Sequence, residues 1–94
     1  MQEQPVDPNA VRRDWAKRGF SCELWEDPPG REWNDFVHPG DELVMVIEGE
    51  VEFEVAGKTH RPGPGEEVFI PRGANHSVRN VGKTRATWLF GYNS

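Results

Sequence analysis

The chain has 94 residues, and its 11 Lys and Arg against 16 Asp and Glu give a formal net charge of −5. This length favours one domain with one core, because independent domains cluster near ~100 to 150 residues. The acidic balance argues against nucleic acid and anionic membranes as partners, since basic side chains must neutralise the phosphates of both.

Hydropathy and cysteine content bear on the compartment. The longest apolar run, residues 43–47, is far shorter than the ~20 residues that cross a bilayer, and the amino terminus lacks the basic-then-apolar pattern of a signal peptide. Cys22 is the single cysteine, which excludes an intramolecular disulfide framework and a cysteine-rich zinc module. We therefore expect a cytoplasmic protein whose fold depends on the packing of its core.

One helix is predicted, near the amino terminus. Asp7 suits its cap, Pro8 its first position and Gly19 its end, with residues 10–18 as its body. We expect residues 1–19 to form an arm that contains this short helix, ahead of a strand-rich unit.

The sequence of the rest of the chain predicts short strands. Ten Gly and eight Pro are spread too evenly for a helical protein. Residues 50–55 alternate polar and apolar side chains, which predicts a strand with one wet and one buried face. Residues 43–47 are apolar on both faces, so the chain terminus, a second sheet or another subunit must cover the outer one, and we take this face as the dimer interface. Further strands are predicted at residues 68–70, 76–81 and 86–90.

Charge is distributed unevenly along these strands. Residues 32–54 contain eight acids and no Lys or Arg, whereas residues 58–85 contain six bases and two acids. Two interpretations stay open: complementary charged faces within a sandwich or across a dimer, and an electrostatically biased pocket mouth.

Three residues at predicted bends could form a metal site. His38 precedes a Pro-Gly bend, and Glu42 opens the strand after it, so both side chains can enter one cavity. His76 begins another strand after a turn. Two His and one carboxylate with open positions suit iron, manganese, nickel or zinc, although each residue could instead be an isolated polar group at a loop edge. No nucleophile elbow or phosphate-binding loop is present, which argues against hydrolases and kinases.

At this point the sequence resembles the cupin family. The second cupin motif, G-x5-P-x-G-x2-H-x3-N, is complete. The first, G-x5-H-x-H-x3-E-x6-G, lacks only its first His, where Phe36 stands. The anchors of the two motifs are Gly30, Phe36, His38, Glu42 and Gly49, then Gly65, Pro71, Gly73, His76 and Asn80.

The resemblance implies a fold and a site. It implies an all-β, small antiparallel jelly-roll (cupin) barrel over residues 20–94, often dimeric, with a metal inside. Metal-binding cupins usually use three His and one Glu, so this chain would retain His38, Glu42 and His76. Cys22 could replace the missing ligand, or it could be a small buried apolar residue.

Strand parity gives the expected cavity wall. Phe36 either fills the core or makes the cavity more apolar and suited to a flat or hydrophobic guest. Trp25 and Trp33 flank a turn and could line the barrel mouth. The predicted pocket residues are Asn34, Phe36, Val44, Val46, Val78 and Asn80.

Two functional hypotheses follow. The first is a single-domain cupin that uses a divalent metal to act on a small organic molecule, as an oxygenase or isomerase. The second is a non-catalytic cupin that binds or senses a small molecule without metal. Both predict a small-molecule ligand and a homodimer.

Overall fold

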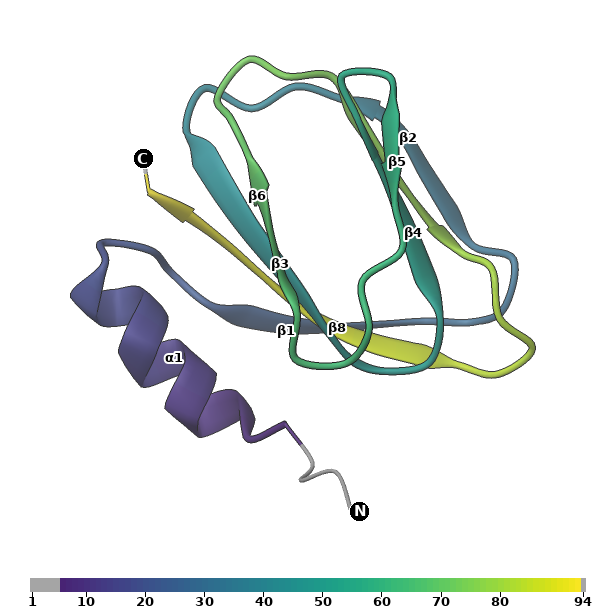
Figure 1. Cartoon of the computed structure of the whole chain (residues 1–94), viewed down its shortest axis with the longest axis horizontal. Coiled ribbons are helices and arrows are strands. Elements are labelled where there is room, and N and C mark those ends of the chain that lie inside the picture. Colours follow the sequence, from purple (N-terminus) through teal and green to yellow (C-terminus); the bar gives the residue numbers. More distant parts are fainter. Residues whose placement is uncertain (1–5, 94) are drawn as a thin grey trace.

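The computed structural model describes residues 6–93 and contains one helix and two antiparallel sheets that face each other (Figure 1). The strand order is β1-β8-β3-β6 in one sheet and β2-β7-β4-β5 in the other. This is an eight-stranded jelly roll, so the predicted fold class is confirmed. The elements are α1 (Pro8–Lys17), β1 (Glu23–Asp27), β2 (Glu32–Phe36), β3 (Asp41–Glu48), β4 (Val51–Val55), β5 (Lys58–His60), β6 (Glu67–Ile70), β7 (His76–Asn80) and β8 (Ala86–Asn93).

The helix begins and ends where its sequence signals place it. The Asp7 side chain caps it by accepting a hydrogen bond of 3.0 Å from the Asn9 backbone N–H. Gly19 follows its last turn with a φ of 86°, which a glycine adopts without strain. Residues 1–5 of the predicted arm lie outside the described residues. Within residues 6–93, no helix is both long and apolar enough to cross a membrane.

The helix lies against the outer face of the first sheet (Figure 1). Trp15 is completely buried there, in one cluster with Leu43, Met45 and Leu89. The face predicted to be a dimer interface is therefore covered by the chain's own helix, and the homodimer stays a prediction. Cys22 also packs against this cluster, and burial raises the pKa of its thiol.

Hydrogen bonds to Glu67 of β6 hold the helix against the sheet. Glu67 accepts hydrogen bonds from both terminal nitrogens of Arg18, at 2.9 and 2.7 Å, and from the Trp15 indole N–H at 3.1 Å. The hydrogen bonds from Arg18 outweigh desolvation and lower the pKa of the Glu67 carboxyl. A bidentate Arg–carboxylate ion pair of this kind fixes the orientation of the two side chains and also contributes to stability.

Just after the helix, the chain passes close to β8. The Ser21 backbone N–H donates to the Tyr92 carbonyl at 2.9 Å, and the Ser21 hydroxyl accepts from the Tyr92 N–H at 3.0 Å. A Cβ on Gly91 would overlap the Ser21 carbonyl oxygen, so this strand position requires glycine.

The main core fills the space between the sheets. The predicted alternation of residues 50–55 holds in β4, where Val51, Phe53 and Val55 are buried and the residues between them are half-exposed. The cluster comprises Val44, Val46, Val51, Phe53, Val55, Ile70, Val78, Ala86 and Trp88.

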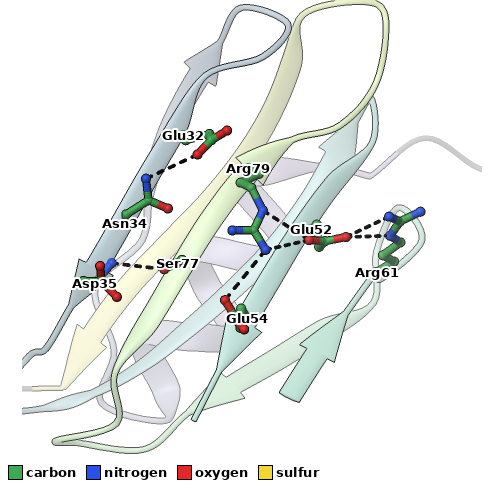
Figure 2. Close-up of polar contacts among 8 residues, drawn as sticks. All are labelled: Glu32, Asn34, Asp35, Glu52, Glu54, Arg61, Ser77 and Arg79. Atoms are coloured by element: carbon green, nitrogen blue, oxygen red, sulfur yellow. Dashed lines mark hydrogen bonds and ion pairs between the residues drawn. The ribbon is translucent and has the colours of Figure 1, made fainter. Parts of the chain in front are cut away.

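The outer face of the second sheet carries an ion-pair network (Figure 2). Arg79 of β7 lies 2.7 Å from the Glu52 carboxylate and 3.7 Å from Glu54, and Arg61 lies 2.8 Å from the other oxygen of Glu52. Its hydrogen bonds from Arg79 and Arg61 lower the pKa of Glu52. Acids of the acid-rich stretch thus pair with bases of the base-rich stretch on one face of this sheet, as the first interpretation of the charge pattern expects, and the second interpretation stays open.

A β-bulge interrupts β2 on the same sheet. Its register against β7 shifts between Trp33 and Phe36, and Asp35 adopts a φ of 59°. The Asp35 backbone N–H donates to the Ser77 hydroxyl at 3.0 Å, which holds the bulge against β7 (Figure 2). A bulge adds one residue to a strand and so breaks the two-residue alternation of its side chains.

Candidate functional site

Three potential metal ligands converge at one end of the barrel. His38 follows β2, Glu42 lies in β3 and His76 begins β7, so both sheets contribute. One ligand atom from each residue lies within 4.8 Å of the others. The structure thus brings together the three residues that the sequence proposed as ligands.

Turn contacts hold the ligands in place. The Gly73 backbone N–H donates to the His38 carbonyl at 2.9 Å, and the Arg72 N–H donates to the Asp41 carboxylate at 2.8 Å. The turns of the two sequence motifs are therefore bonded directly to each other. This contact fixes the loop of His38 against the loop that leads into His76.

Glu42 is the most informative of the three. Its side chain is buried, and among the described residues its Oε1 has no hydrogen-bond partner of good geometry. That oxygen lies 3.2 Å from His76 Nε2 and 3.8 Å from His38 Nε2. A buried carboxylate oxygen without a donor is costly, so this atom is available to a ligand when His76 is neutral, whereas a protonated His76, 3.2 Å away, would supply the donor itself.

The carboxylate also changes the properties of His76. Burial by itself lowers the pKa of His76, but the Glu42 carboxylate and the Ala74 carbonyl, 3.3 Å from Nδ1, outweigh it and raise the pKa. Because the Nδ1 atom of His76 contacts the Ala74 carbonyl, the other ring nitrogen, Nε2, faces Glu42. A backbone partner of this kind is typical of metal-binding His.

The donor set fits a divalent first-row metal. Ligand bonds of ~2.1 Å place neighbouring ligand atoms about 3 Å apart. The separation of 3.2 Å between Glu42 Oε1 and His76 Nε2 is close to this spacing, the one of 3.8 Å to His38 Nε2 is wider, and all three ligand atoms lie within 4.8 Å of one another. Two imidazoles and one carboxylate suit iron, manganese, nickel and zinc.

Tyr92 of β8 is a fourth polar group at the site, and the sequence analysis missed it. Its hydroxyl lies 3.4 Å from His38 Nε2. Burial and then the charge of Glu42 raise the pKa of Tyr92 to about 12, so the phenol stays protonated at neutral pH. The predicted last strand ended at Phe90; continuing its alternation by two residues would have found Tyr92.

A cavity of about 220 Å³ adjoins the three ligands. Phe36 and Val78 of the predicted wall line it, and so do both tryptophans expected at the barrel mouth, Trp25 and Trp33. The remaining lining residues are His38, Glu42, His76, Trp88, Phe90 and Tyr92.

Phe36 shapes the cavity and does not fill the core. Its side chain is 37% exposed. Its ring is stacked 6.2 Å from His38 at an angle of 7°, and it lies 6.1 Å from His76. In the position of the missing first His, Phe36 therefore supports both imidazoles with an apolar surface.

Four residues predicted in the wall do not line the cavity. Asn34 is exposed because the β2 bulge turns Trp33 inward in its place. Val44 and Val46 are completely buried in the core, where side chains from both sheets cover them. The Asn80 amide instead donates to the Asp27 and Thr84 carbonyls, at 3.1 and 3.0 Å. Its role is thus to hold loops together.

A buried carboxylate behind the cavity wall was also missed by the sequence analysis. Asp27 is 4% exposed and accepts the indole N–H of Trp25 at 2.9 Å, of Trp33 at 3.1 Å and of Trp88 at 3.0 Å. Trp25 and Trp33 are two and six residues from Asp27, but Trp88 is 61 residues away in β8, so no local sequence pattern joins all three. This group, named here the Asp27 anchor, positions three of the rings that line the cavity.

Known proteins are similar to this chain in sequence and in shape. Polyketide synthase CurC from Streptomyces cyaneus is 33% identical over 63 residues, which cover 66% of this chain and 41% of that protein. Dimethylsulfoniopropionate lyase DddQ from Ruegeria pomeroyi is 38% identical over 53 residues, which cover 55% of this chain and 26% of that protein. A solved oxalate oxidase in complex with the substrate analogue glycolate has a TM-score of 0.73 at 31% identity, over 82% of this chain and 43% of that chain.

These relatives are longer proteins, and the chain spans less than half of each of them. Their similarity therefore concerns the barrel and its site. The family model of the cupin domain matches residues 23–92, from the first strand to the last. Together with the jelly-roll strand order, this match shows that the chain belongs to the cupin family.

Proposed function

We propose that the chain is a metal-dependent enzyme that acts on a small organic molecule, as an oxygenase or isomerase. His38, Glu42 and His76 would hold the ion. The observation that carries this proposal is the buried Glu42 Oε1, which has no hydrogen bond of good geometry and lies beside two imidazole nitrogens. When bound, a divalent ion supplies a Lewis acid, and iron or manganese supplies redox chemistry as well.

The chain's own residues would perform the remaining tasks. The aromatic wall excludes water from one side of the cavity and positions an apolar part of the substrate. The Tyr92 hydroxyl, 3.4 Å from His38, can donate a hydrogen bond to a substrate oxygen. The named activities of the relatives, on oxalate and on dimethylsulfoniopropionate, support a small organic substrate.

One feature favours a second candidate, a cupin that binds or senses a small molecule without metal. Phe36 takes the place of the first His of the cupin motif and leaves three ligands instead of four. In that case Glu42 and the two His would bind the ligand by hydrogen bonds. A cytoplasmic location and a homodimer stay predictions under both proposals.

Metal content tests the first proposal directly. The untagged chain is purified without chelators, and bound metals are measured by mass spectrometry beside Glu42→Gln and His76→Ala variants. We expect near-stoichiometric metal in the parent and less than a tenth of it in both variants. Glu48→Gln, which changes an exposed carboxyl on the same strand, is the matched control and should retain the metal.

Stability gives a second measurement. A metal at 100 times its dissociation constant should stabilise the parent by about 2.7 kcal/mol and leave Glu42→Gln unchanged. If the parent is empty and stays empty after incubation with iron, manganese, nickel and zinc, the metalloenzyme proposal is wrong and the metal-free one takes its place.

A further inference from the structure

Six aromatic rings bound the cavity outside the His–Glu cluster, and they are not parallel. Neighbouring planes meet at 71° for Trp25 and Trp33, 49° for Trp33 and Phe36, and 48° for Trp88 and Phe90. Rings set at such angles enclose a compact guest from several sides, whereas a flat guest needs parallel walls. The six rings, named here the aromatic cage, are Trp25, Trp33, Phe36, Trp88, Phe90 and Tyr92.

The charges around the aromatic cage are negative. No Lys or Arg lines the cavity in residues 6–93, and Glu42 supplies a carboxylate at one end. Asp27 lies behind the opposite wall, and within the described part of the chain it forms no ion pair. The charge of Glu42 can be balanced by a bound metal or by His76. The charge of Asp27 has no ion-pair partner in residues 6–93, and the exposed guanidinium of Arg31, 4.2 Å from the Trp33 ring centroid, offsets only part of it on the tryptophan side.

The Asp27 anchor also acts on the ring faces. An indole that donates its N–H to a carboxylate becomes more electron-rich, because hydrogen-bonded groups polarise one another in a medium of low dielectric constant. The face of an indole attracts cations through its negative quadrupole, and a nearby carboxylate adds to this attraction. One of these rings already has a cation on its face, since the Arg31 guanidinium carbon lies 4.2 Å from the Trp33 ring centroid.

We propose that the aromatic cage binds a small organic cation of the quaternary ammonium or sulfonium class. A permanently charged, alkylated centre fits it, because such a group needs apolar contact on every side and gives up little hydration. A cavity of ~150 Å³ accommodates benzene, so the 220 Å³ here leaves room for a somewhat larger guest. The inference rests on the proposed function in that it names the ligand class of the same cavity.

A pair of probes of equal shape tests the charge requirement. Choline and its uncharged isostere 3,3-dimethylbutan-1-ol are titrated into the full chain, with calorimetry and tryptophan fluorescence as readouts. We expect choline to bind at least tenfold more tightly than the alcohol. Equal or tighter binding of the alcohol, or no binding of choline to the folded protein at millimolar concentration, would overturn the inference.

Variants locate the binding to the aromatic cage. Trp25 is 42% exposed, so the protein should tolerate its replacement. Trp25→Leu should weaken choline binding at least threefold and leave the binding of the alcohol nearly unchanged, and Trp25→Phe, which keeps an aromatic face, should restore most of the affinity. Equal affinity of both variants for choline would contradict the placement.

A ligand variant separates this inference from the proposed function. His76→Ala should lose the metal yet keep the preference for choline over the alcohol, because the cage rings remain. Metal binding by the parent without any preference for the cation would refute the cation site alone. A preserved preference in a parent that takes up no metal would refute the metal proposal alone.

Discussion

The Asp27 anchor makes a sharp prediction for the substitution Asp27→Asn. Asp27 accepts three indole N–H groups with its two oxygens. Asparagine has one acceptor oxygen, so its amide nitrogen must face one of the donors. We expect the oxygen to stay with the indole of Trp88, which is buried, and the amide group to displace Trp25, whose ring is 42% exposed and can donate to water.

The expected cost can be worked out from these contacts. A hydrogen bond to a charged acceptor contributes about 1.5 to 3 kcal/mol and a neutral one about 0.5 to 1.5 kcal/mol. The two retained bonds therefore lose about 1 kcal/mol each, and the bond from Trp25 is lost to water. The variant also escapes the cost of burying a charge, which offsets part of this loss. The net destabilisation should be about 2 kcal/mol, which is a large fraction of the ~5 to 14 kcal/mol expected for a domain of this size.

Urea unfolding measures this difference, with far-UV circular dichroism and tryptophan fluorescence as probes. The matched control is Glu26→Gln, which neutralises the adjacent acid. Glu26 is 51% exposed and pairs with Arg85 only at 3.6 Å, so its loss should change stability by less than ~0.5 kcal/mol. If the effect of Asp27→Asn is as small as that of the control, the three indole contacts do not anchor the aromatic cage.

Two further predictions concern the attachment of the helix side of the molecule. Gly91→Ala should unfold the protein or detach the segment at Ser21, because the new Cβ would overlap a backbone oxygen. In the control Gly82→Ala, the new Cβ would lie 3.3 Å from the Glu50 Cβ, which is slightly tight, so this variant should cost much less. Thermal melts compare the two variants, and equal melting temperatures would contradict the close approach at Gly91. Glu67→Gln should destabilise the protein by about 1 to 2 kcal/mol at pH 7. Arg18 lowers the pKa of Glu67 in the folded state. The ionised Glu67 therefore contributes fully to the free energy of unfolding above the ordinary glutamate pKa of ~4.3, and this contribution disappears as the pH falls through the lower folded-state pKa. Urea titrations of parent and variant from pH 7 to 3 should therefore converge; a constant difference would refute the ionic contribution.

The strands that follow simple rules were predictable from the sequence. The period-two pattern of β4 and the turn residues before β7 are local, and local patterns survive in the fold. The outer face of β3 was recognised as covered, but a sequence cannot say whether a helix or a second subunit covers it. The helix is shown to cover this face by contacts distant in sequence, in which Trp15 packs against Leu43, Met45 and Leu89 and donates a hydrogen bond to Glu67, 52 residues away.

The site was predictable where motif spacing controls it. His38, Glu42 and His76 follow turns whose geometry the sequence encodes, and the structure brings them together. The cavity wall was harder to predict because of the bulge at Asp35. The bulge adds one residue to β2, so Trp33 faces the cavity where strict alternation from Phe36 would place Asn34. The Asp27 anchor joins two nearby tryptophans to Trp88, which is 61 residues away, so its full set depends on tertiary packing.

The order of strands in the sheets has a consequence for how the cavity comes into being. Strand β8 lies between β1 and β3, and its register pairs Glu23 with Phe90, so the first sheet is complete only after a contact that spans most of the chain. The second sheet likewise needs Glu32 to meet Arg79. Such distant pairings form late and slowly during folding. The cavity therefore forms only when both sheets are complete, and a ligand can bind only then. During refolding, the rate of ligand binding should be limited by pairing of the distant strands and not by diffusion of the ligand.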